Sequence, residues 1–475
     1  MSISTQAESI AQELESIGQS TLAQYLRGVT GSGANILCEQ LADLNLDQIA
    51  SYIQTYGPNF TPPPPPSQIE PAPYFGINDP SWDRALYESK GEELIKDGKV
   101  ACFVVAGGQG SRLGYEGPKG CYPTSCVTDK SLFEMFAQTI YANQRKYECV
   151  IPWYIMTSPL NNEQTELFFK EHSYFGLDPK NIQFIIQGVM PSFDKETGDL
   201  LLIDPAHLAT NPDGHGGAYR ALQNSGAVDD MLNRGIEHLS YFQVDNPNSK
   251  IIDPVFIGLH AHSPESSSEF SSKMVAKASA SEKVGVFCRV SDQLSVVEYS
   301  DLPSDLAEMT NDAGELMYNA GSIAIHMIST SFIAKIASDP NYALPFHRAV
   351  KKVAHFETQT GQQIDPQEPN AIKLEQFVFD AIALADRSIV IETDRIQEFA
   401  PVKNASGTDS IISSKQIQTQ RAAQWLSEAG VQIPLNADGS VNATIELSPM
   451  TALCPEDLKG QDLPKSIEPG QSIAL

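Results

Sequence analysis

The sequence predicts an α/β fold with a largely parallel sheet, between a helical N-terminal region and a small β-containing C-terminal domain. From Val100 onward, short apolar runs alternate with stretches of helical periodicity, which is the pattern of strands joined by helices. Residues 1–98 show helical periodicity, and after Pro401 the pattern becomes irregular, with strand-like pieces near Val431 and over Ala443–Leu447. We therefore expect three domains, 1–98, 99–400 and 401–475.

The N-terminal region contains two predicted helices and a proline run. Apolar residues at helical spacing predict one amphipathic helix over residues 5–29 and a second over Leu41–Tyr56. The five prolines Pro62–Pro66 predict an extended polyproline segment that is a domain boundary or a stiff strap. A further helix over Trp82–Gly98 leads into the first strand.

The central region supplies the expected sheet and its connections. The predicted strands are Val100–Ala106, Trp153–Thr157, Ile182–Gln187, Leu239–Asp245, Val284–Arg289, Gly321–His326 and Ile389–Glu392. The predicted helices between them are Ser131–Lys146, Asn161–Lys170, Tyr219–Asn233 and Leu374–Ala385.

Composition excludes several classes of partner. The chain carries 59 acidic and 32 basic residues, a net charge of −27, so we expect neither nucleic acid nor an anionic membrane to bind its surface. It has no apolar stretch of about 18 residues and an acidic, polar N-terminus unlike a secretory signal. Seven cysteines without a CxxC pair predict reduced thiols and a cytoplasmic location.

A glycine-rich loop follows the first predicted strand. Gly107, Gly108 and Gly110 allow backbone amides to approach an anion, and Arg112 and Lys119 supply countercharge. A strand that delivers such a loop to the edge of a sheet is typical of nucleotide sites in α/β folds. The alternative is a glycine-rich turn with two solvated cations.

The loop matches neither of two common phosphate-binding patterns. A P-loop ends in Gly-Lys-Ser/Thr, whereas Lys119 follows Pro118 and precedes Gly120. The dinucleotide fingerprint requires glycine where this chain has Leu113, which also argues against an NAD-dependent oxidoreductase.

Polar residues at other strand ends extend the candidate site. Gln187 could read the edge of a base or lie in a turn, and His215, in a glycine cluster that opens a helix, could contact a ligand or cap that helix. Asp245 ends an apolar strand, where it could hold Mg²⁺ against substrate phosphates or cap a turn. Lys403 alone reads as a surface residue.

Several collinear motifs resemble those of UTP-dependent sugar-1-phosphate uridylyltransferases, especially the eukaryotic-type UDP-N-acetylglucosamine pyrophosphorylases. The resemblance runs from Trp82 to the C-terminus through AGGQGSRLGYEGPKG, FGLDPKNIQFIIQG, PDGHGGAYRAL, VGVFCRVSDQLSVVEYS, NAGSIAIH, EFAPVKNA and IELSP. It implies a Rossmann-like mixed sheet of the nucleotide-diphospho-sugar transferase type. It also implies UTP and a sugar 1-phosphate as substrates, a UDP-sugar and pyrophosphate as products, and Mg²⁺ as cofactor.

The resemblance also implies roles for individual residues. Those expected to bind the nucleotide are Ala106, Gly107, Gly108, Gln187, Gly214 and Lys373. Those expected to stabilise charge on the reacting phosphates are Arg112, Lys119 and Lys403. Asp245 is the expected metal ligand. Those expected to meet the sugar are His215, Gly285, Glu298, Asn319 and Ser322.

The implied reaction needs no nucleophilic side chain. A phosphate oxygen of the sugar 1-phosphate attacks the α-phosphorus of UTP in line, so catalysis consists of positioning and charge stabilisation. We expect N-acetylglucosamine 1-phosphate as the substrate and a monomeric enzyme. His215 and Ser322 stand where the hexosamine enzymes usually carry Asn, which leaves glucose 1-phosphate or a broad sugar range as the alternative. A non-catalytic UDP-sugar-binding protein is a third interpretation, disfavoured because Arg112, Lys119 and Asp245 are all present.

Overall fold

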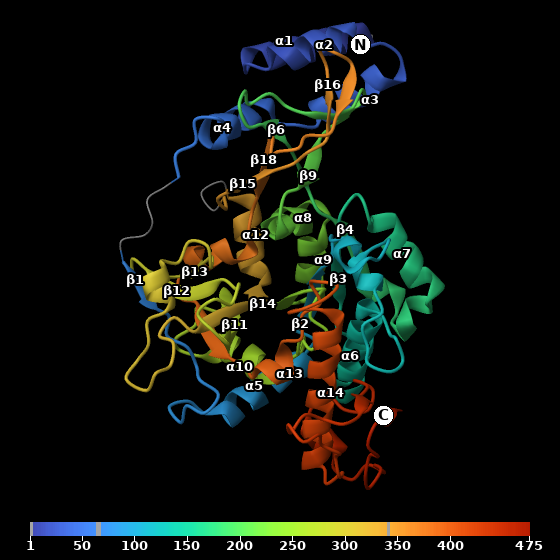
Figure 1. The fold of residues 1–475 in the computed structure, drawn as a ribbon, viewed down its shortest axis with the longest axis vertical. Coiled ribbons are helices and arrows are strands. Elements are labelled where there is room, and N and C mark those ends of the chain that lie inside the picture. The colour runs from blue at the N-terminus through green and yellow to red at the C-terminus, as the bar shows by residue number, and fades with distance from the viewer. Residues whose placement is uncertain (1–2, 63–67, 340–342) are drawn as a thin grey trace. The chain divides into compact units, whose positions relative to one another are not determined.

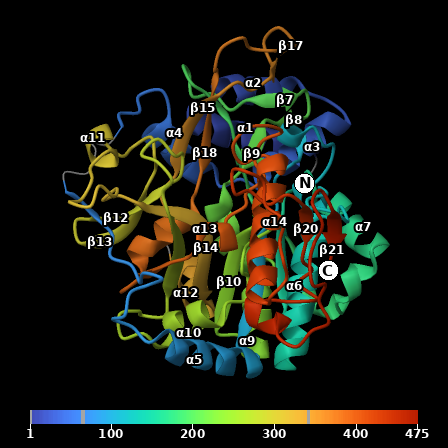
Figure 2. The ribbon, with the colours of Figure 1, turned by 60° about the horizontal axis from the view of Figure 1, so that its bottom comes forward.

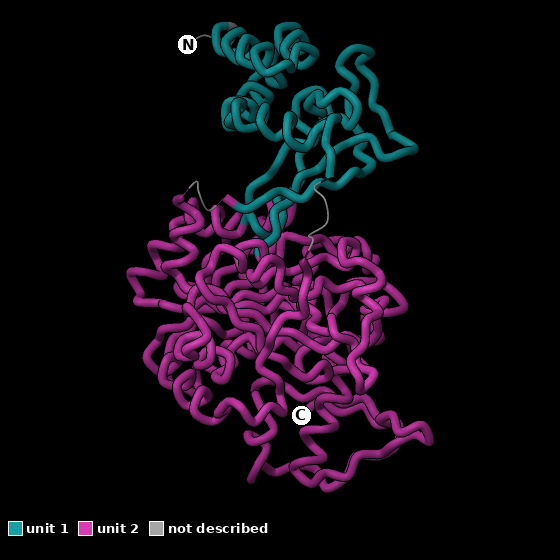
Figure 3. The backbone as a smooth tube through the Cα atoms, turned by 90° about the vertical axis from the view of Figure 1, so that its left-hand side faces the viewer, with its two compact units in different colours: residues 1–65, 188–217, 344–378 teal, residues 66–187, 218–343, 379–475 magenta. Residues whose placement is uncertain are grey.

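A computed structural model describes residues 3–62, 68–339 and 343–475 (Figure 1). Residues 63–66 of the predicted proline strap therefore lie outside the described residues. The chain divides into two compact units, coloured in Figure 3. Unit 1 comprises residues 1–65, 188–217 and 344–378, and unit 2 comprises residues 66–187, 218–343 and 379–475. These units do not follow the boundaries expected from the sequence, and the three-domain division stays a prediction.

The N-terminal segment of unit 1 is helical. Its helices are α1 (Ile3–Ser16), α2 (Ser20–Gly28), α3 (Ser32–Ala42) and α4 (Leu46–Tyr56). The single helix predicted over residues 5–29 was wrong, because the chain turns at Gly18, whose φ is +82°. The helix predicted over Leu41–Tyr56 is also divided, because the Asn45 side chain accepts a hydrogen bond from the Gln48 amide and caps a new helix.

The rest of unit 1 is made of short strands. They are β5 (Val189–Pro191), β6 (Phe193–Asp194), β7 (Leu202–Asp204), β8 (His207–Leu208), β9 (Thr210–Pro212), β15 (His347–Lys351), β16 (His355–Glu357), β17 (Gln362–Ile364) and β18 (Ala371–Glu375). They pair in the orders β15-β18-β6, β17-β16-β7-β8 and β5-β9. The core draws on all three segments of the unit, through Leu14, Leu202 and Leu374 among others.

The helix predicted over Leu374–Ala385 is confirmed only in part, because its first two residues belong to strand β18 (Ala371–Glu375). Burial alternates along β18, where Ile372 and Leu374 are buried and Lys373 between them is half-buried, so this stretch pairs as a strand. Most of the remaining predicted residues form the 3₁₀ helix η7 (Val378–Leu384).

Unit 2 is built on a mixed sheet. Among the described residues its strands are β1 (Ile69–Pro71), β2 (Val100–Val105), β3 (Trp153–Thr157), β4 (Ile182–Ile186), β10 (His238–Gln243), β11 (Phe270–Ala276), β12 (Val286–Val290), β13 (Gln293–Val297), β14 (Ala320–Ser329) and β19 (Ile389–Glu392). The central order is β1-β12-β14-β10-β2-β3-β4. Strands β10, β2, β3 and β4 are parallel, whereas β14 runs antiparallel to β10, β11 and β12.

All seven predicted strands are therefore present, whereas β1, β11 and β13 were not predicted. The half of the sheet that carries the glycine-rich loop is parallel, whereas the other half is antiparallel except for the pair β11–β19, so the expectation of a largely parallel sheet was right only in part. The expectation of a mixed α/β sheet is confirmed.

Helices cover this sheet (Figures 1 and 2). They are α5 (Arg84–Lys96), α6 (Leu132–Tyr147), α7 (Asn162–Glu171), α8 (Ala218–Asn224), α9 (Ala227–Arg234), α10 (Pro254–His262), α11 (Ser304–Ala307), α12 (Thr330–Ser338), α13 (Arg395–Glu398) and α14 (Ile411–Glu428). The helix predicted over Tyr219–Asn233 is divided at Gly226, whose φ is +75°. Helices α5 and α10 lie side by side in both views and touch through Gly91 and Gly258.

The C-terminal region, expected to be irregular, begins with the 18-residue helix α14. Beyond it, β20 (Thr444–Glu446) pairs in parallel with β21 (Ser472–Ala474), which confirms the strand expected near Ala443–Leu447. The strand expected near Val431 is reduced to a single bridge between Gln432 and Ser466. Ala422, Leu426 and Ile445 belong to a separate small core. No helix in the described part of the chain is long and apolar enough to cross a membrane.

Candidate active site

The carboxyl ends of parallel strands β2, β4 and β10 bring predicted site residues to one edge of the unit 2 sheet. Gly107 follows β2 and Gln187 follows β4, and the two come close together. A Cβ atom added at Gly107 would lie 2.3 Å from Gln187 Oε1, so a larger residue there would displace the Gln187 side chain. The structure thus joins two of the residues predicted to bind the nucleotide.

The glycine-rich loop folds back on itself. The amide of Lys119 donates to Gly108 O at 3.0 Å, and the amide of Gly110 donates to Gly117 O at 2.9 Å. Lys119 begins the 3₁₀ turn η2 (Lys119–Cys121), and the loop therefore returns this cation to the glycines that precede it. Arg112 lies exposed in η1 (Ser111–Leu113) and forms no ion pair with a described residue.

Asn161 holds the start of this loop, and sequence reasoning missed it. Its fully buried side chain donates from Nδ2 to Ala106 O at 2.9 Å and to Gly108 O at 3.3 Å. Its Oδ1 accepts from the Ser158 amide at 2.8 Å. The only signal in the sequence is an asparagine pair shortly after β3, which is equally typical of a helix N-terminus.

Lys119 and Asp245 form an ion pair at this edge. The distance from Lys119 Nζ to Asp245 Oδ2 is 3.4 Å, and the two side chains are 16% and 14% exposed. Asp245 follows β10, as predicted. The structure therefore brings the predicted phosphate-binding cation next to the predicted metal ligand, with both partly shielded from water.

The segment that carries Lys403 runs beside Asp245. The Val402 amide donates to Asp245 O at 2.8 Å, and Lys403 Nζ lies 3.9 Å from Asp409 Oδ2. Burial raises the pKa of Asp409; Lys403 opposes this increase and Asp245 adds to it. Lys403 thus lies next to the site and not on an unrelated surface, although its role stays a prediction.

Asn246 and a buried ion cluster anchor this segment. Asn246 donates from Nδ2 to Glu398 O at 2.7 Å, and its Oδ1 accepts from the Ala400 amide at 2.9 Å. The Glu398 carboxylate accepts from Lys273 Nζ at 2.7 Å, and Lys273, 1% exposed, also donates to Asp253 Oδ2 at 2.6 Å. These contacts hold the backbone of residues 398–400, which precede Lys403 in the chain.

The residues predicted to meet the sugar form a second group in unit 2. The Ser322 amide donates to Gly285 O at 2.8 Å, and a Cβ atom added at Gly285 would lie 3.3 Å from Glu298 Oε1. Asn319 O accepts from the Lys277 amide at 2.9 Å. Lys277 is a further residue that the sequence did not single out, and burial lowers its pKa.

Unit 1 holds the other predicted residues, Gly214, His215 and Lys373. Gly214 has a φ of +86°, and a Cβ atom there would lie 2.3 Å from Gln376 O. The His215 ring stacks on Phe377 with centroids 5.2 Å apart, and its Nδ1 accepts from the Val378 amide at 3.0 Å.

The electrostatic state of His215 follows from this environment. Burial lowers the pKa of His215 to about 4, with a smaller contribution from His347. The ring is therefore neutral near pH 7, and because Nδ1 accepts a hydrogen bond, its proton resides on Nε2. Lys373 lies on β18, opposite Ala349 of β15.

The donor set at Asp245 limits what kind of metal could bind. Within residues 3–62, 68–339 and 343–475, no group of three or more His, Cys, Asp or Glu side chains is arranged to hold a metal ion. One carboxylate at the edge of a phosphate-binding loop fits a cation that takes most of its ligands from phosphate oxygens and water, as Mg²⁺ does.

Comparison with known proteins places this site in context. The family model described as UTP–glucose-1-phosphate uridylyltransferase matches residues 77–431. A UDP-N-acetylglucosamine pyrophosphorylase of Saccharomyces cerevisiae is 37% identical over 371 residues, covering 77% of each chain. The UDP-N-acetylglucosamine diphosphorylase 2 of Arabidopsis thaliana is 32% identical, covering 95% of this chain and 91% of the relative. The crystal structure of a Trypanosoma brucei uridine diphosphate N-acetylglucosamine pyrophosphorylase aligns over 97% of this chain and 98% of its own with a TM-score of 0.78; at 24% identity it shows a shared fold.

Proposed function

Because the chain belongs to the UTP–glucose-1-phosphate uridylyltransferase family of nucleotidyltransferases, we propose that it forms UDP-N-acetylglucosamine and pyrophosphate from UTP and N-acetylglucosamine 1-phosphate. The observation that carries this proposal is the Lys119–Asp245 pair beside the glycine-rich loop. The choice of sugar rests on the relatives that are 32–37% identical over most of the chain and are named for N-acetylglucosamine.

The chemistry needs only positioning and charge. A phosphate oxygen of the sugar 1-phosphate forms a bond to the α-phosphorus of UTP, and the bond from that phosphorus to the β-phosphate oxygen breaks to release pyrophosphate. In this proposal the loop amides and Lys119 bind the phosphates, and Lys403 and Arg112 add positive charge that opposes the growing negative charge.

Asp245 would hold a magnesium ion in this scheme. When bound, such an ion neutralises phosphate charge and orients the triphosphate. The 3.4 Å contact with Lys119 supports this role, because it sets the carboxylate beside the cation that we propose to bind the phosphates.

Glucose 1-phosphate is the second candidate substrate, and His215 is the reason to test it. This neutral imidazole, with its proton on Nε2, stands where the hexosamine enzymes usually carry Asn. A site built around particular hydrogen bonds rejects a sugar that leaves them unpaired. We further propose a monomeric enzyme of the cytoplasm, in keeping with seven cysteines that are all free thiols.

Pyrophosphate release tests the proposal. UTP is supplied with the 1-phosphate of N-acetylglucosamine, N-acetylgalactosamine, glucose or galactose, each with and without Mg²⁺. We expect Mg²⁺-dependent release that is fastest with N-acetylglucosamine 1-phosphate. Equal rates with glucose 1-phosphate would contradict the sugar assignment, and no release with any of the four would contradict the enzymatic function.

A further inference from the structure

The loop of residues 122–130 joins the turn that carries Lys119 to helix α6. The Tyr122 amide donates to Lys119 O at 3.0 Å, so the loop begins in direct contact with the Lys119 backbone. The loop is closed by hydrogen bonds from the Thr124 amide to Lys130 O and from the Lys130 amide to Ser125 Oγ, both 2.8 Å. The loop is therefore closed on itself and hydrogen-bonded directly to the Lys119 backbone.

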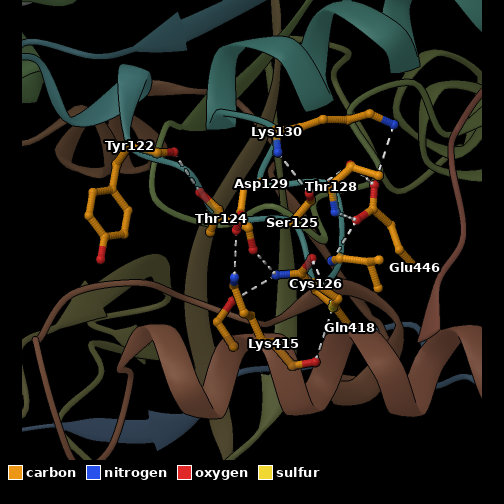
Figure 4. Close-up of polar contacts among 12 residues, drawn as sticks. Tyr122, Thr124, Ser125, Cys126, Thr128, Asp129, Lys130, Lys415, Gln418 and Glu446 are labelled. Carbon is orange, nitrogen blue, oxygen red and sulfur yellow. Dashed lines mark hydrogen bonds and ion pairs between the residues drawn. The ribbon is translucent and has the colours of Figure 1, made fainter. Parts of the chain in front are cut away.

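The Glu446 carboxylate accepts hydrogen bonds from the tip of this loop (Figure 4). Its Oε2 accepts from the amides of Val127 and Thr128, each at 2.8 Å, and its Oε1 accepts from Thr128 Oγ1 at 2.5 Å. Lys130 Nζ lies 3.3 Å from the same Oε1. Both carboxylate oxygens are thus used, and two backbone amides that no helix or strand satisfies find their acceptor here.

The charge and the position of Glu446 are both well defined. Burial alone would raise the pKa of Glu446, but hydrogen bonds from Thr128 and Val127 outweigh it and lower this pKa to about 2. Glu446 ends β20, whose preceding residue Ile445 is fully buried in the C-terminal core and is hydrogen-bonded through its backbone to Thr419 of α14. The acceptor is therefore an anion fixed to a packed element.

Helix α14 holds the other side of the loop. Gln418 Nε2 donates to Thr124 O at 3.2 Å, and Lys415 Nζ pairs with Asp129 Oδ1 at 3.1 Å. Figure 4 shows these side chains reaching the loop from the helix that lies opposite it. The same helix contacts the Lys403 segment, because Ser414 Oγ donates to Ala400 O at 2.6 Å.

We propose that Glu446 is a positioning residue for the reaction: by holding Val127 and Thr128, it fixes the loop that places Lys119 beside Asp245. This inference rests on the proposed uridylyltransferase function. In this view β20 and α14 support the active site. Together they hold the loop next to Lys119, and α14 also contacts the segment that carries Lys403. Because misplacement by about 1 Å can cost about 100-fold in rate, a support of this kind matters even far from the substrate.

Three substitutions test whether the Glu446 carboxylate positions the loop. Glu446→Ala removes all four contacts, and we expect kcat to fall about 10- to 100-fold, while KM for UTP changes by less than about threefold, because the glycine amides and Gln187 are untouched. Glu446→Gln keeps an acceptor oxygen and should recover part of kcat. Thr128→Val removes the hydroxyl, with its contacts to Glu446 and to Ser125 Oγ, but keeps both backbone amides on Glu446, and it should cost less than Glu446→Ala.

Amide hydrogen exchange supplies a readout independent of activity. In Glu446→Ala the amides of residues 122–130 should exchange faster, while those of β2 and β10 keep wild-type rates. Thermal melting accompanies each variant so that loss of folded protein is not mistaken for loss of positioning.

Asp457→Asn is the matched control. Asp457 also joins the C-terminal region to the sheet domain, through Lys146 Nζ of α6 at 3.0 Å, but it does not touch the loop. Its variant should melt at a lower temperature and keep kcat within about twofold of wild type, because loosening this contact does not move Lys119.

The results distinguish a failure of the proposed role of Glu446 from a failure of the proposed function. A folded Glu446→Ala variant with wild-type kcat, or an Asp457→Asn variant that loses kcat equally, would overturn the inference. If the wild-type protein itself releases no pyrophosphate, the proposed function fails. The exchange experiment then still decides whether Glu446 holds the loop.

Discussion

Lys119 is held through both its backbone and its side chain. Its amide is hydrogen-bonded to Gly108 and its ammonium group lies 3.4 Å from Asp245, so backbone and side chain are both fixed before any ligand binds. The next residue, Gly120, has no room for a side chain, because a Cβ atom would lie 2.1 Å from the Phe133 ring. Such preorganised charge costs no reorganisation during the reaction.

Replacing Lys119 by Met should therefore impair catalysis far more than folding. We expect kcat to fall about 100- to 1000-fold, the usual cost of losing one preorganised charge at a reacting group. Steady-state pyrophosphate release measures the effect, and circular dichroism verifies the fold. Lys170→Met is the control, because the exposed Lys170 pairs, among the described residues, with Glu166 of the same helix α7, and its loss should leave kcat unchanged. Similar rates for the two variants would show that Lys119 does not act on the phosphates.

His238 illustrates how burial makes a residue sensitive to pH. It opens β10, is 6% exposed and packs edge-to-face on the His260 ring with centroids 5.1 Å apart. Burial lowers the pKa of His238 to about 4. The folded protein therefore keeps this ring neutral at pH values where the unfolded chain, with a pKa of about 6.5, already binds a proton.

The free energy of unfolding should consequently decrease as the pH falls from about 6.5 to about 4, by roughly 3 kcal/mol from His238 alone. Above pH 6.5 both states are neutral and this contribution is absent. Urea unfolding at a series of pH values measures the slope, and His238→Leu should flatten it by that amount. A variant whose pH dependence equals that of wild type would contradict the assignment of the slope to His238.

At the scale of elements, the crossing of α5 and α10 depends on two glycines. A Cβ atom added at Gly91 would lie 1.8 Å from Pro254 O, and one added at Gly258 would lie 1.8 Å from Tyr87 O. Both obstacles are backbone atoms, which cannot rotate away. The two helices therefore approach more closely than any side chain would allow.

Gly91→Ala should separate these helices and destabilise the protein by about 1–3 kcal/mol, despite the better helix propensity of Ala. Chemical denaturation reports the change. Gly28→Ala offers a comparison, because Gly28 ends α2 with no atom within 4 Å of an added Cβ, and there we expect a gain of about 0.4–1 kcal/mol. A neutral Gly91→Ala substitution would mean that the helices can move apart at no cost.

Elements with a strong local pattern were predictable from the sequence, and those defined by distant partners were not. The parallel strands β2, β3 and β4 are largely apolar runs and were found almost to the residue. Helix α14 was missed because it lacks a broad apolar stripe and is held by polar contacts such as Gln418 to Thr124. The apolar spacing over residues 5–29 concealed the break at Gly18, since apolar residues recur at helical spacing both before and after it.

The same distinction applies to the candidate site. Strand-end residues such as Gln187 and Asp245 could be predicted because a parallel sheet collects strand ends at one edge. Asn161 and Glu446 could not, because many of their partners are backbone groups, which leave no mark in the sequence. For Glu446 and Val127 those groups are 319 residues apart in the chain.

At the scale of the whole molecule, the composite core of unit 1 has a testable effect. The helices α1–α4 bury apolar side chains against residues of the two later segments, including Leu202 and Leu374. Deleting residues 3–57 should therefore expose this core, so that β7, β16 and β18 lose protection from hydrogen exchange and the protein associates on size exclusion. Adding residues 1–62 as a separate peptide should restore part of the protection. A monomeric truncated chain with wild-type exchange over residues 193–208 would contradict this view.

The three-segment construction of unit 1 also governs how the protein is made. The core that receives Leu14 and Leu41 is complete only when Ile372 and Leu374 have been translated. Synthesis at about 5–20 residues per second means that α1–α4 leave the ribosome roughly 15–60 s before their last partners. During this interval their apolar faces are open to other chains, so slower translation lengthens the period in which a nascent chain can aggregate or be bound by a chaperone.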